Sequence, residues 1–206
     1  MSDAGDVLEQ LNVSRETSER LRIYVELLKK WTAKINLVSK SSLDQVWTRH
    51  IWDSAQLFEF APPAGHWVDL GSGGGFPGLV IACLAADSAP EMRMTLIESD
   101  QRKAAFLRTV VRETGVRATV LVERAENAAP QEADVLSARA LSDLTTLLGF
   151  AELHRRQGGI ALFQKGINWE KEVTDALTTW SFEHEVIKSK TEPGAVILKI
   201  GGATRV

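Results

Sequence analysis

The sequence WVDLGSGGGFPGLVIACLAAD, residues 67–87, places five glycines among eight positions between an apolar run and a helix-like run. Glycine is needed where the backbone takes positive φ or where a ligand approaches closer than a Cβ permits. The pattern predicts a strand, a loop and a helix, with Pro77 in the first helical turn. A ligand of such a loop lies over the helix N-terminus at the carboxyl edge of a sheet. A flexible linker is therefore disfavoured.

Strand and helix patterns alternate around this loop. Strands are predicted over residues 66–70, 92–99, 118–123, 133–138 and, after a tight Gly-Gly turn, 159–165; helices are predicted over residues 76–86, 101–115 and 144–155. Because parallel neighbours need crossover connections, this alternation predicts an α/β fold with a mostly parallel sheet and helices on both faces. Residues 182–189 and 195–200 are strand-like and only KTEPG separates them, which predicts a C-terminal antiparallel hairpin.

Two amphipathic helices are expected before the glycine loop. The first begins at Ser14 and repeats apolar residues at helical spacing, with Lys and Arg on its exposed side. The second begins at Ser42, where Gln45 three residues later fits a capping box. The prolines of APPAGH then end the helical part. We therefore expect an N-terminal helical extension over residues 1–62 and one compact Rossmann-like domain over residues 63–206.

The composition is typical of a globular protein. With 206 residues, 44% of them hydrophobic and 25% charged, the chain can bury a core. Its longest uncharged apolar run falls well short of the ~20 residues that a membrane span requires, so no membrane association is expected. The acidic start MSDAGDVLEQ lacks the basic region of a signal peptide, and a cytoplasmic location is expected. Cys83 is the one cysteine; we expect it in the core, and we expect no metal.

The glycine loop fits two classes of cofactor. Gly73, Gly75 and Gly78 satisfy the G-x-G-x-x-G pattern, and Glu98 follows at about the distance used for a nicotinamide ribose. Asp69 favours S-adenosylmethionine, because a carboxylate there orients the loop or meets a cationic amino-acid group, whereas beside a pyrophosphate it is repulsive. The terminal hairpin also fits a class I methyltransferase, and no Tyr-x-x-x-Lys motif lies nearby. S-adenosylmethionine is favoured, with an NAD(P)-dependent oxidoreductase as the alternative.

The chain resembles the bacterial ribosomal RNA small subunit methyltransferase G family, also called glucose-inhibited division protein B. The resemblance runs from Leu21 to the C-terminus and rests on the motifs KKWTAKINLVSK, RHIWDSAQL, VDLGSGGGFPGLVIA, IESDQRKAAFL, ERAEN, DVLSARAL and FQKG. It implies a Rossmann-like class I fold, S-adenosylmethionine as donor, and methylation of N7 of one guanine in the decoding-region loop of 16S rRNA. Glu123 and Ala138 depart from the family pattern, which leaves the geometry of two donor-site loops open.

The expected donor site combines residue chemistry with this resemblance. Glu98 ends the predicted second strand, where its carboxylate can accept both ribose hydroxyls. The resemblance places further donor contacts on Gly71, Phe76, Ala125 with Glu126, and Arg139. The complete predicted set is Asp69, Gly71, Ser72, Gly73, Gly75, Phe76, Glu98, Ser99, Ala125, Glu126 and Arg139.

Four residues are candidates for the catalytic side of the site. Arg139 ends the fourth predicted strand, where its guanidinium can hold a carboxylate, a phosphate or guanine O6, and Lys165 ends the fifth strand on the same edge. His50 and Asp53 belong to the RHIWDSAQL motif and are expected near the active site, although Arg49 with Asp53 is also a simple i, i+4 pair. No general base is required, because guanine N7 already carries a free lone pair.

Binding of RNA requires a local basic patch, because the net charge is −3. Residues 15–49 carry 8 Lys/Arg against 4 Asp/Glu and residues 93–117 carry 6 against 3, whereas residues 119–185 carry 6 against 11. We expect the first two regions to face phosphates of 16S rRNA within the small ribosomal subunit or an assembly intermediate, through cations that include Arg102, Lys103, Arg108 and Arg112. The protein is expected to act as a monomer; a non-catalytic RNA-binding or assembly factor is the other alternative.

Overall fold

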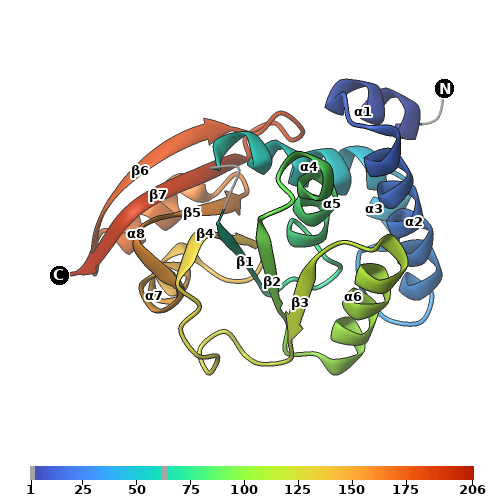
Figure 1. Cartoon of the computed structure of the whole chain (residues 1–206). Helices are drawn as coiled ribbons and strands as arrows, with labels where there is room; N and C mark the ends of the chain where they lie inside the picture. Colours follow the sequence, from blue (N-terminus) through green and yellow to red (C-terminus); the bar gives the residue numbers. More distant parts are fainter. Residues whose placement is uncertain (1–2, 62–64) are drawn as a thin grey trace.

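A mixed sheet of seven strands forms the middle layer of the computed structural model, which describes residues 3–61 and 65–206 (Figure 1). The strand order is β3-β2-β1-β4-β5-β7-β6. The strands are β1 (His66–Leu70), β2 (Arg93–Ile97), β3 (Ala118–Leu121), β4 (Ala133–Arg139), β5 (Arg155–Lys165), β6 (Trp180–Lys188) and β7 (Val196–Arg205). Strands β1 to β5 pair in parallel, while β7 pairs antiparallel with both β5 and β6. The predicted α/β sheet with its C-terminal hairpin is confirmed.

Helices cover both faces of this sheet. They are α1 (Asp3–Leu11), α2 (Arg15–Thr32), α3 (Lys40–Leu43), the π-helix η1 (Trp47–Trp52), α4 (Asp53–Ala55), the 3-10 helix η2 (Gln56–Phe60), α5 (Gly78–Ser88), α6 (Gln101–Thr114), α7 (Leu144–His154) and α8 (Trp169–Ala176). One apolar core joins α1, α2, α5 and α6 to the sheet, and a second core joins α7 and α8 to the sheet. Cys83 is fully buried in the first core, as predicted.

The stretch predicted as one helix from Ser42 is instead divided into short helical segments, and the predicted capping box is wrong. Ser39 caps α3, because its Oγ accepts a hydrogen bond from the backbone N–H of Ser42 at 3.2 Å. The Ser42 hydroxyl lies instead 2.9 Å from Nε2 of His50. Residues 47–52 form a π-helix, whose wider turn changes which side chains share a face. This irregularity brings His50 and Asp53 towards the sheet edge.

Other boundaries also differ from the prediction. Helices α1 and α8 were not predicted, and Pro77 is the residue that precedes α5 rather than part of its first turn. The predicted Gly-Gly turn is wrong, because Gly158 and Gly159 lie within β5. A Cβ at Gly159 would lie 2.6 Å from the carbonyl oxygen of Ala133, so glycine permits the close approach of β4 there.

The N-terminal helices share a core with the sheet. Helix α2 packs on α5 and α6, and its buried residues Leu21, Tyr24, Val25 and Leu28 belong to the first core. The predicted boundary between residues 62 and 63 lies outside the described residues. Within the described ranges, the helices are all too short or too polar to cross a membrane.

Candidate functional site

The glycine loop connects β1 to α5 at the carboxyl edge of the sheet, as the sequence predicts. Gly71, Gly73 and Gly75 have φ values of 61°, 52° and 93°, a region that residues with a Cβ rarely adopt. Two bonds tie the loop to β2: the N–H of Ser72 donates to the carbonyl of Ile97 at 3.1 Å, and the N–H of Gly73 donates to Oε2 of Glu98 at 2.8 Å. The loop is therefore held open over the sheet edge.

A cavity of about 300 Å³ lies beside this loop. It is lined by six of the predicted donor residues, Gly71, Gly73, Glu98, Ser99, Ala125 and Glu126. Seven further residues complete the lining and were not predicted as donor contacts: Ile97, Lys103, Glu123, Arg124, Ala140, Leu141 and Phe150. Glu123, one of the two departures from the family pattern, is exposed at the rim. The carboxyl ends of β1, β2 and β3 thus meet at one small concave site.

Glu98 lies at the centre of the contacts around this cavity. Its side chain is buried, and its two oxygens accept from the N–H of Gly73 and the N–H of Asp100, both at 2.8 Å. Each carboxylate oxygen has a second lone pair, so the group can still accept two hydroxyls from a ligand. Binding of a ribose diol by Glu98 stays a prediction.

The other predicted donor residues do not line this cavity. Asp69 is fully buried, its Oδ1 accepts from the Ser137 hydroxyl at 2.7 Å, and burial raises its pKa to about 6. Ser72 is also buried, and its hydroxyl donates to the carbonyl of Asp69 at 3.1 Å. Both residues shape the base of the glycine loop. Gly75 lies against Leu79, Arg139 lines the neighbouring cavity, and Phe76 is buried beneath the guanidinium of Arg139.

His154 supports the part of the cavity beside the glycine loop that Ala125 lines. It is fully buried in α7 and its Nε2 donates to the carbonyl oxygen of Ala125 at 2.7 Å. Burial lowers the pKa of this imidazole, which keeps it neutral. No sequence signal distinguishes His154 from an ordinary core residue, because its partner lies 29 positions away.

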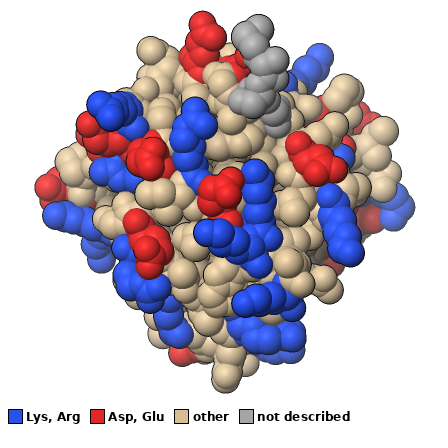
Figure 2. All heavy atoms as spheres, turned by 90° about the vertical axis from the view of Figure 1, so that its right-hand side faces the viewer, with Lys and Arg blue, Asp and Glu red and all other residues tan. Residues whose placement is uncertain are grey.

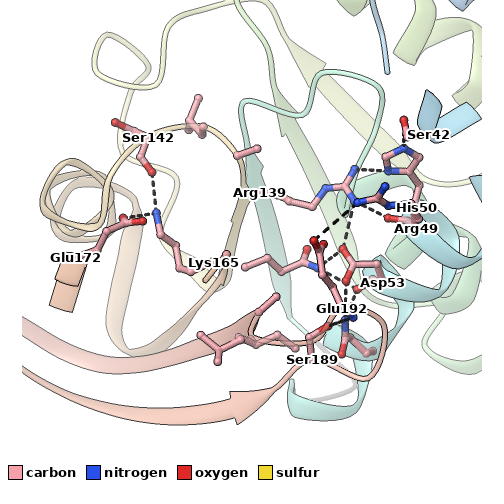
Figure 3. A pocket seen from close by; sticks show the side chains of 18 of the residues that line it. Ser42, Arg49, His50, Asp53, Arg139, Ser142, Lys165, Glu172, Ser189 and Glu192 are labelled. Carbon is pink, nitrogen blue, oxygen red and sulfur yellow. Dashed lines mark hydrogen bonds and ion pairs between the residues drawn. The ribbon is translucent and has the colours of Figure 1, made fainter. Parts of the chain in front are cut away.

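A second, larger cavity of about 760 Å³ adjoins the donor cavity and contains all four predicted catalytic residues (Figure 3). Arg139, Lys165, His50 and Asp53 come from β4, β5 and the irregular N-terminal helices. Ala140 and Leu141 line both cavities, and a Cβ at Gly71 would collide with the Leu141 side chain. The short segment after β4 therefore forms the wall between the two cavities.

The guanidinium of Arg139 is fixed on three sides. Its Nη1 donates to Oδ2 of Asp53 at 3.2 Å, and its Nη2 donates to Nδ1 of His50 at 3.0 Å. The same group lies 4.8 Å from the ring centre of Phe76, a cation–π distance. The Arg139 and Asp53 side chains are 18% and 17% exposed, so their ion pair is shielded from water but open to the cavity. Figure 3 shows Arg139, His50 and Asp53 together at the cavity wall.

His50 is neutral in this arrangement. Burial and the positive charges of Arg139 and Arg49 lower its pKa to about 3. Because Nδ1 accepts from Arg139, the proton is on Nε2, which donates to Ser42 Oγ. The imidazole also stacks on Phe76, with ring centres 4.9 Å apart. His50 thus orients Arg139 and Phe76.

Asp53 joins four segments of the chain. Besides Arg139, its carboxylate accepts from Gln164 at 2.7 Å, from Thr191 at 2.6 Å and from Gln56 at 2.9 Å. These partners lie on β5, in the turn between β6 and β7, and in η2. No sequence signal singles out Gln164, Thr191 or Gln56, because each is an isolated polar residue in an ordinary element. An i, i+4 pair with Arg49 is not formed; within the described residues Arg49 pairs with Glu192 at 3.8 Å.

Lys165 is buried, and its ammonium group has two partners. Its Nζ donates to Oε2 of Glu172 at 2.6 Å and to the carbonyl oxygen of Ser142 at 2.9 Å. Glu172 also accepts from the N–H of Leu144 at the start of α7. Lys165 and Glu172 therefore hold the wall segment from the β5 and α8 side (Figure 3). Glu172 was not predicted, because the sequence analysis missed α8.

Comparison with known proteins identifies the family. The family model described as rRNA small subunit methyltransferase G matches residues 17–196. A ribosomal RNA small subunit methyltransferase G from a Ruegeria species is 58% identical over 206 residues, with all of both chains covered. The protein of the same name from Ruegeria pomeroyi is 59% identical over 196 residues, covering 95% of this chain and 96% of the relative.

The chain belongs to the rRNA small subunit methyltransferase G family. The family prediction made from the sequence is confirmed, and with it the expected enzyme class, an S-adenosylmethionine-dependent methyltransferase. The NAD(P)-dependent oxidoreductase considered as an alternative is thereby set aside.

Solved structures agree on the fold of this family member. TYW2 from M. jannaschii, solved in complex with AdoMet, aligns with a TM-score of 0.57 at 14% identity, covering 85% of this chain and 80% of that one. A SAM-dependent methyltransferase from Aquifex aeolicus gives a TM-score of 0.57 at 12% identity, covering 87% and 97%. Both similarities concern the class I methyltransferase fold alone. Among the described residues, no group of three His, Cys, Asp or Glu is arranged to hold a metal ion.

Proposed function

We propose that this protein transfers the methyl group of S-adenosylmethionine to N7 of a guanine in 16S rRNA of the small ribosomal subunit, following its family. The observation that supports the proposal is the pair of adjoining cavities, one lined by the glycine loop and the Glu98 carboxylate and the other by Arg139, which Asp53 and His50 hold. The wall formed by Ala140 and Leu141 is where donor and acceptor would meet. We further propose that the protein acts in the cytoplasm, as a monomer and without a metal.

The six predicted donor residues that line the cavity beside the glycine loop support S-adenosylmethionine as its ligand. Gly71 lines the cavity and has no room for a Cβ beside Leu141. Glu98 would offer acceptors for the ribose hydroxyls, and Ala125 with Glu126 would lie against the adenine. When bound, the donor supplies an electrophilic methyl on a sulfonium. The protein would hold the sulfonium methyl at the wall formed by Ala140 and Leu141 and would keep water away from it.

The larger cavity, which contains Arg139 and is called the acceptor cavity from here on, suits a reaction that needs alignment rather than proton removal. Guanine N7 attacks with its own lone pair, so no base is required. His50, with its low pKa and its nitrogens engaged, is placed to orient Arg139 rather than to take a proton. Arg139 can donate to guanine O6, beside N7, or to the phosphate of the target nucleotide. Alignment of this kind supplies about 7–11 kcal/mol in favourable cases.

The RNA-binding face would lie over α2 and α6. Figure 2 shows Lys and Arg side chains gathered on this face, with acids interspersed. Arg102 and Arg112 are paired with Asp100 and Glu113, but Lys34 and Lys103 form no ion pair within the described part of the chain. Both lysines line a surface hollow next to the donor cavity, and Lys103 lines the donor cavity as well. Phosphates on this face would lie close to the methyl donor.

The decisive experiment is transfer of a labelled methyl group to small ribosomal subunits from a strain that lacks this activity, followed by mapping of the modified nucleotide. We expect one labelled guanine carrying the methyl at N7. Folded enzyme that binds S-adenosylhomocysteine but leaves the RNA unlabelled would instead support the non-catalytic alternative, an RNA-binding or assembly factor. Lys34→Gln should raise KM for subunits and reduce its salt dependence without changing donor affinity.

A further inference from the structure

Helix α2 reaches the glycine loop through one side chain, that of Tyr24. This residue is fully buried and its hydroxyl donates to the carbonyl oxygen of Gly74 at 2.5 Å. Burial raises the pKa of the phenol well above its usual value, so the hydroxyl keeps its proton and remains a donor. The N-terminal extension thus supplies a hydrogen bond to the backbone of the donor loop.

The contact lies at the tightest bend of the loop. Gly74 is flanked by Gly73 and Gly75, both with positive φ, and a Cβ at Gly75 would lie 2.6 Å from the Tyr24 hydroxyl. Gly73 in turn presents its N–H to Glu98. Movement of the Gly74 carbonyl would therefore displace the loop residues that line the donor cavity.

The aromatic ring of Tyr24 makes a second, separate contact. It stacks on Phe76, with ring centres 5.4 Å apart and an interplanar angle of 29°. The ring of Phe76 also contacts the guanidinium of Arg139 and stacks with the imidazole of His50. A continuous stack therefore runs from the buried core to the residues at the wall of the acceptor cavity.

We infer that Tyr24 is a positioning residue for both halves of the site: its hydroxyl holds the donor loop, and its ring sets the plane of Phe76 on which Arg139 rests. Only the role of the ring rests on the proposed function, because its test measures methyl transfer to RNA. The first half concerns the conformation of the loop in the free protein and its affinity for the donor.

Two matched variants test the hydroxyl. Tyr24→Phe removes the hydroxyl bonded to Gly74, and Thr17→Val removes another buried hydroxyl of α2, which donates to Asp87 at 2.7 Å far from the loop. We expect Tyr24→Phe to weaken S-adenosylhomocysteine binding about fivefold by calorimetry and to speed amide hydrogen exchange at Gly73, Gly74 and Gly75. Thr17→Val should leave both quantities unchanged even if it lowers the melting temperature.

A third variant tests the ring. Tyr24→Leu should weaken donor binding as Tyr24→Phe does and should also lower kcat with subunits at least tenfold, because Phe76 and Arg139 lose their support. Equal donor affinity and equal loop exchange in Tyr24→Phe and wild type would overturn the role of the hydroxyl. Equal kcat in Tyr24→Leu and Tyr24→Phe would overturn the role of the ring. If the wild type itself fails to methylate RNA, the proposed function fails, while loop exchange and donor affinity still decide the inference about the hydroxyl.

Discussion

Gly78, the first residue of α5, is the position where the packing of helix on sheet leaves least room. A Cβ there would lie 2.8 Å from both Cβ and Oδ2 of Asp69 and closer still to Leu96. Asp69 and Leu96 are both fully buried, and Asp69 is held by the Ser137 hydroxyl at 2.7 Å. Neither neighbour can move into free space, so Gly78→Ala must shift α5 away from β1 and β2.

Overpacking of a core lowers the free energy of unfolding by about 1–3 kcal/mol. Because neither Asp69 nor Leu96 can move aside, we expect the steric cost of Gly78→Ala near the upper end of this range. The better helix propensity of alanine returns up to ~1 kcal/mol, which leaves a net loss of about 2 kcal/mol. For a protein of this size the melting temperature should fall by about 4–8 °C.

Gly149→Ala provides the matched control, because Gly149 lies inside α7 and a Cβ there meets nothing nearer than 3.9 Å. With no steric cost, this variant should be more stable than wild type by about 0.5–1 kcal/mol. Urea unfolding and scanning calorimetry measure both changes. A Gly78→Ala variant at least as stable as wild type, or two substitutions that change stability in the same direction, would show that the buried contact with Asp69 and Leu96 does not limit this position.

Three further outcomes follow from the site. Asp53→Asn should lower kcat more than tenfold while S-adenosylhomocysteine affinity stays within twofold of wild type by calorimetry, since Asp53 holds Arg139 but does not line the donor cavity. Glu98→Gln should weaken S-adenosylhomocysteine binding at least tenfold, because hydrogen bonds to a carboxylate are worth about 1.5–3 kcal/mol. Asp69 has a folded pKa of about 6 against 3.8, so its ionisation destabilises the fold: urea midpoints should fall as pH rises from about 4 to about 6, and Asp69→Asn should flatten that fall.

The donor half of the site was predictable because its information is local. Five glycines between a strand and a helix predict the loop, and Glu98 is the residue immediately after β2. The role of Asp69 required the structure, since burial against Ser137 is a contact between two strands 68 positions apart. Sequence spacing left open whether its carboxylate faces a ligand or the loop; the structure places it beneath the loop.

The acceptor half was predictable only in part. The motif that contains His50 and Asp53 does line the larger cavity, but the single helix expected there is a π-helix between two short α-helices. Hydrophobic periodicity assumes a regular helix and cannot detect this change of pitch. The polar partners of Asp53 come from β5 and from the turn after β6, over sequence separations of 111 and 138 residues.

Asp53 links the irregular N-terminal helices to the hairpin that distinguishes this sheet from a fully parallel one. The turn between β6 and β7 reaches it through Thr191, and β5 reaches it through Gln164. Because β7 is inserted antiparallel between β5 and β6, that turn lies at the same edge as Arg139 at the end of β4. The cavity beside the glycine loop, by contrast, is lined by Ile97 at the end of β2, by the loops after β1 to β4, and by Lys103 of α6 and Phe150 of α7. The cavity that contains Arg139 is therefore built from segments between residues 39 and 197, whereas the cavity beside the glycine loop is built from residues between 71 and 150 alone.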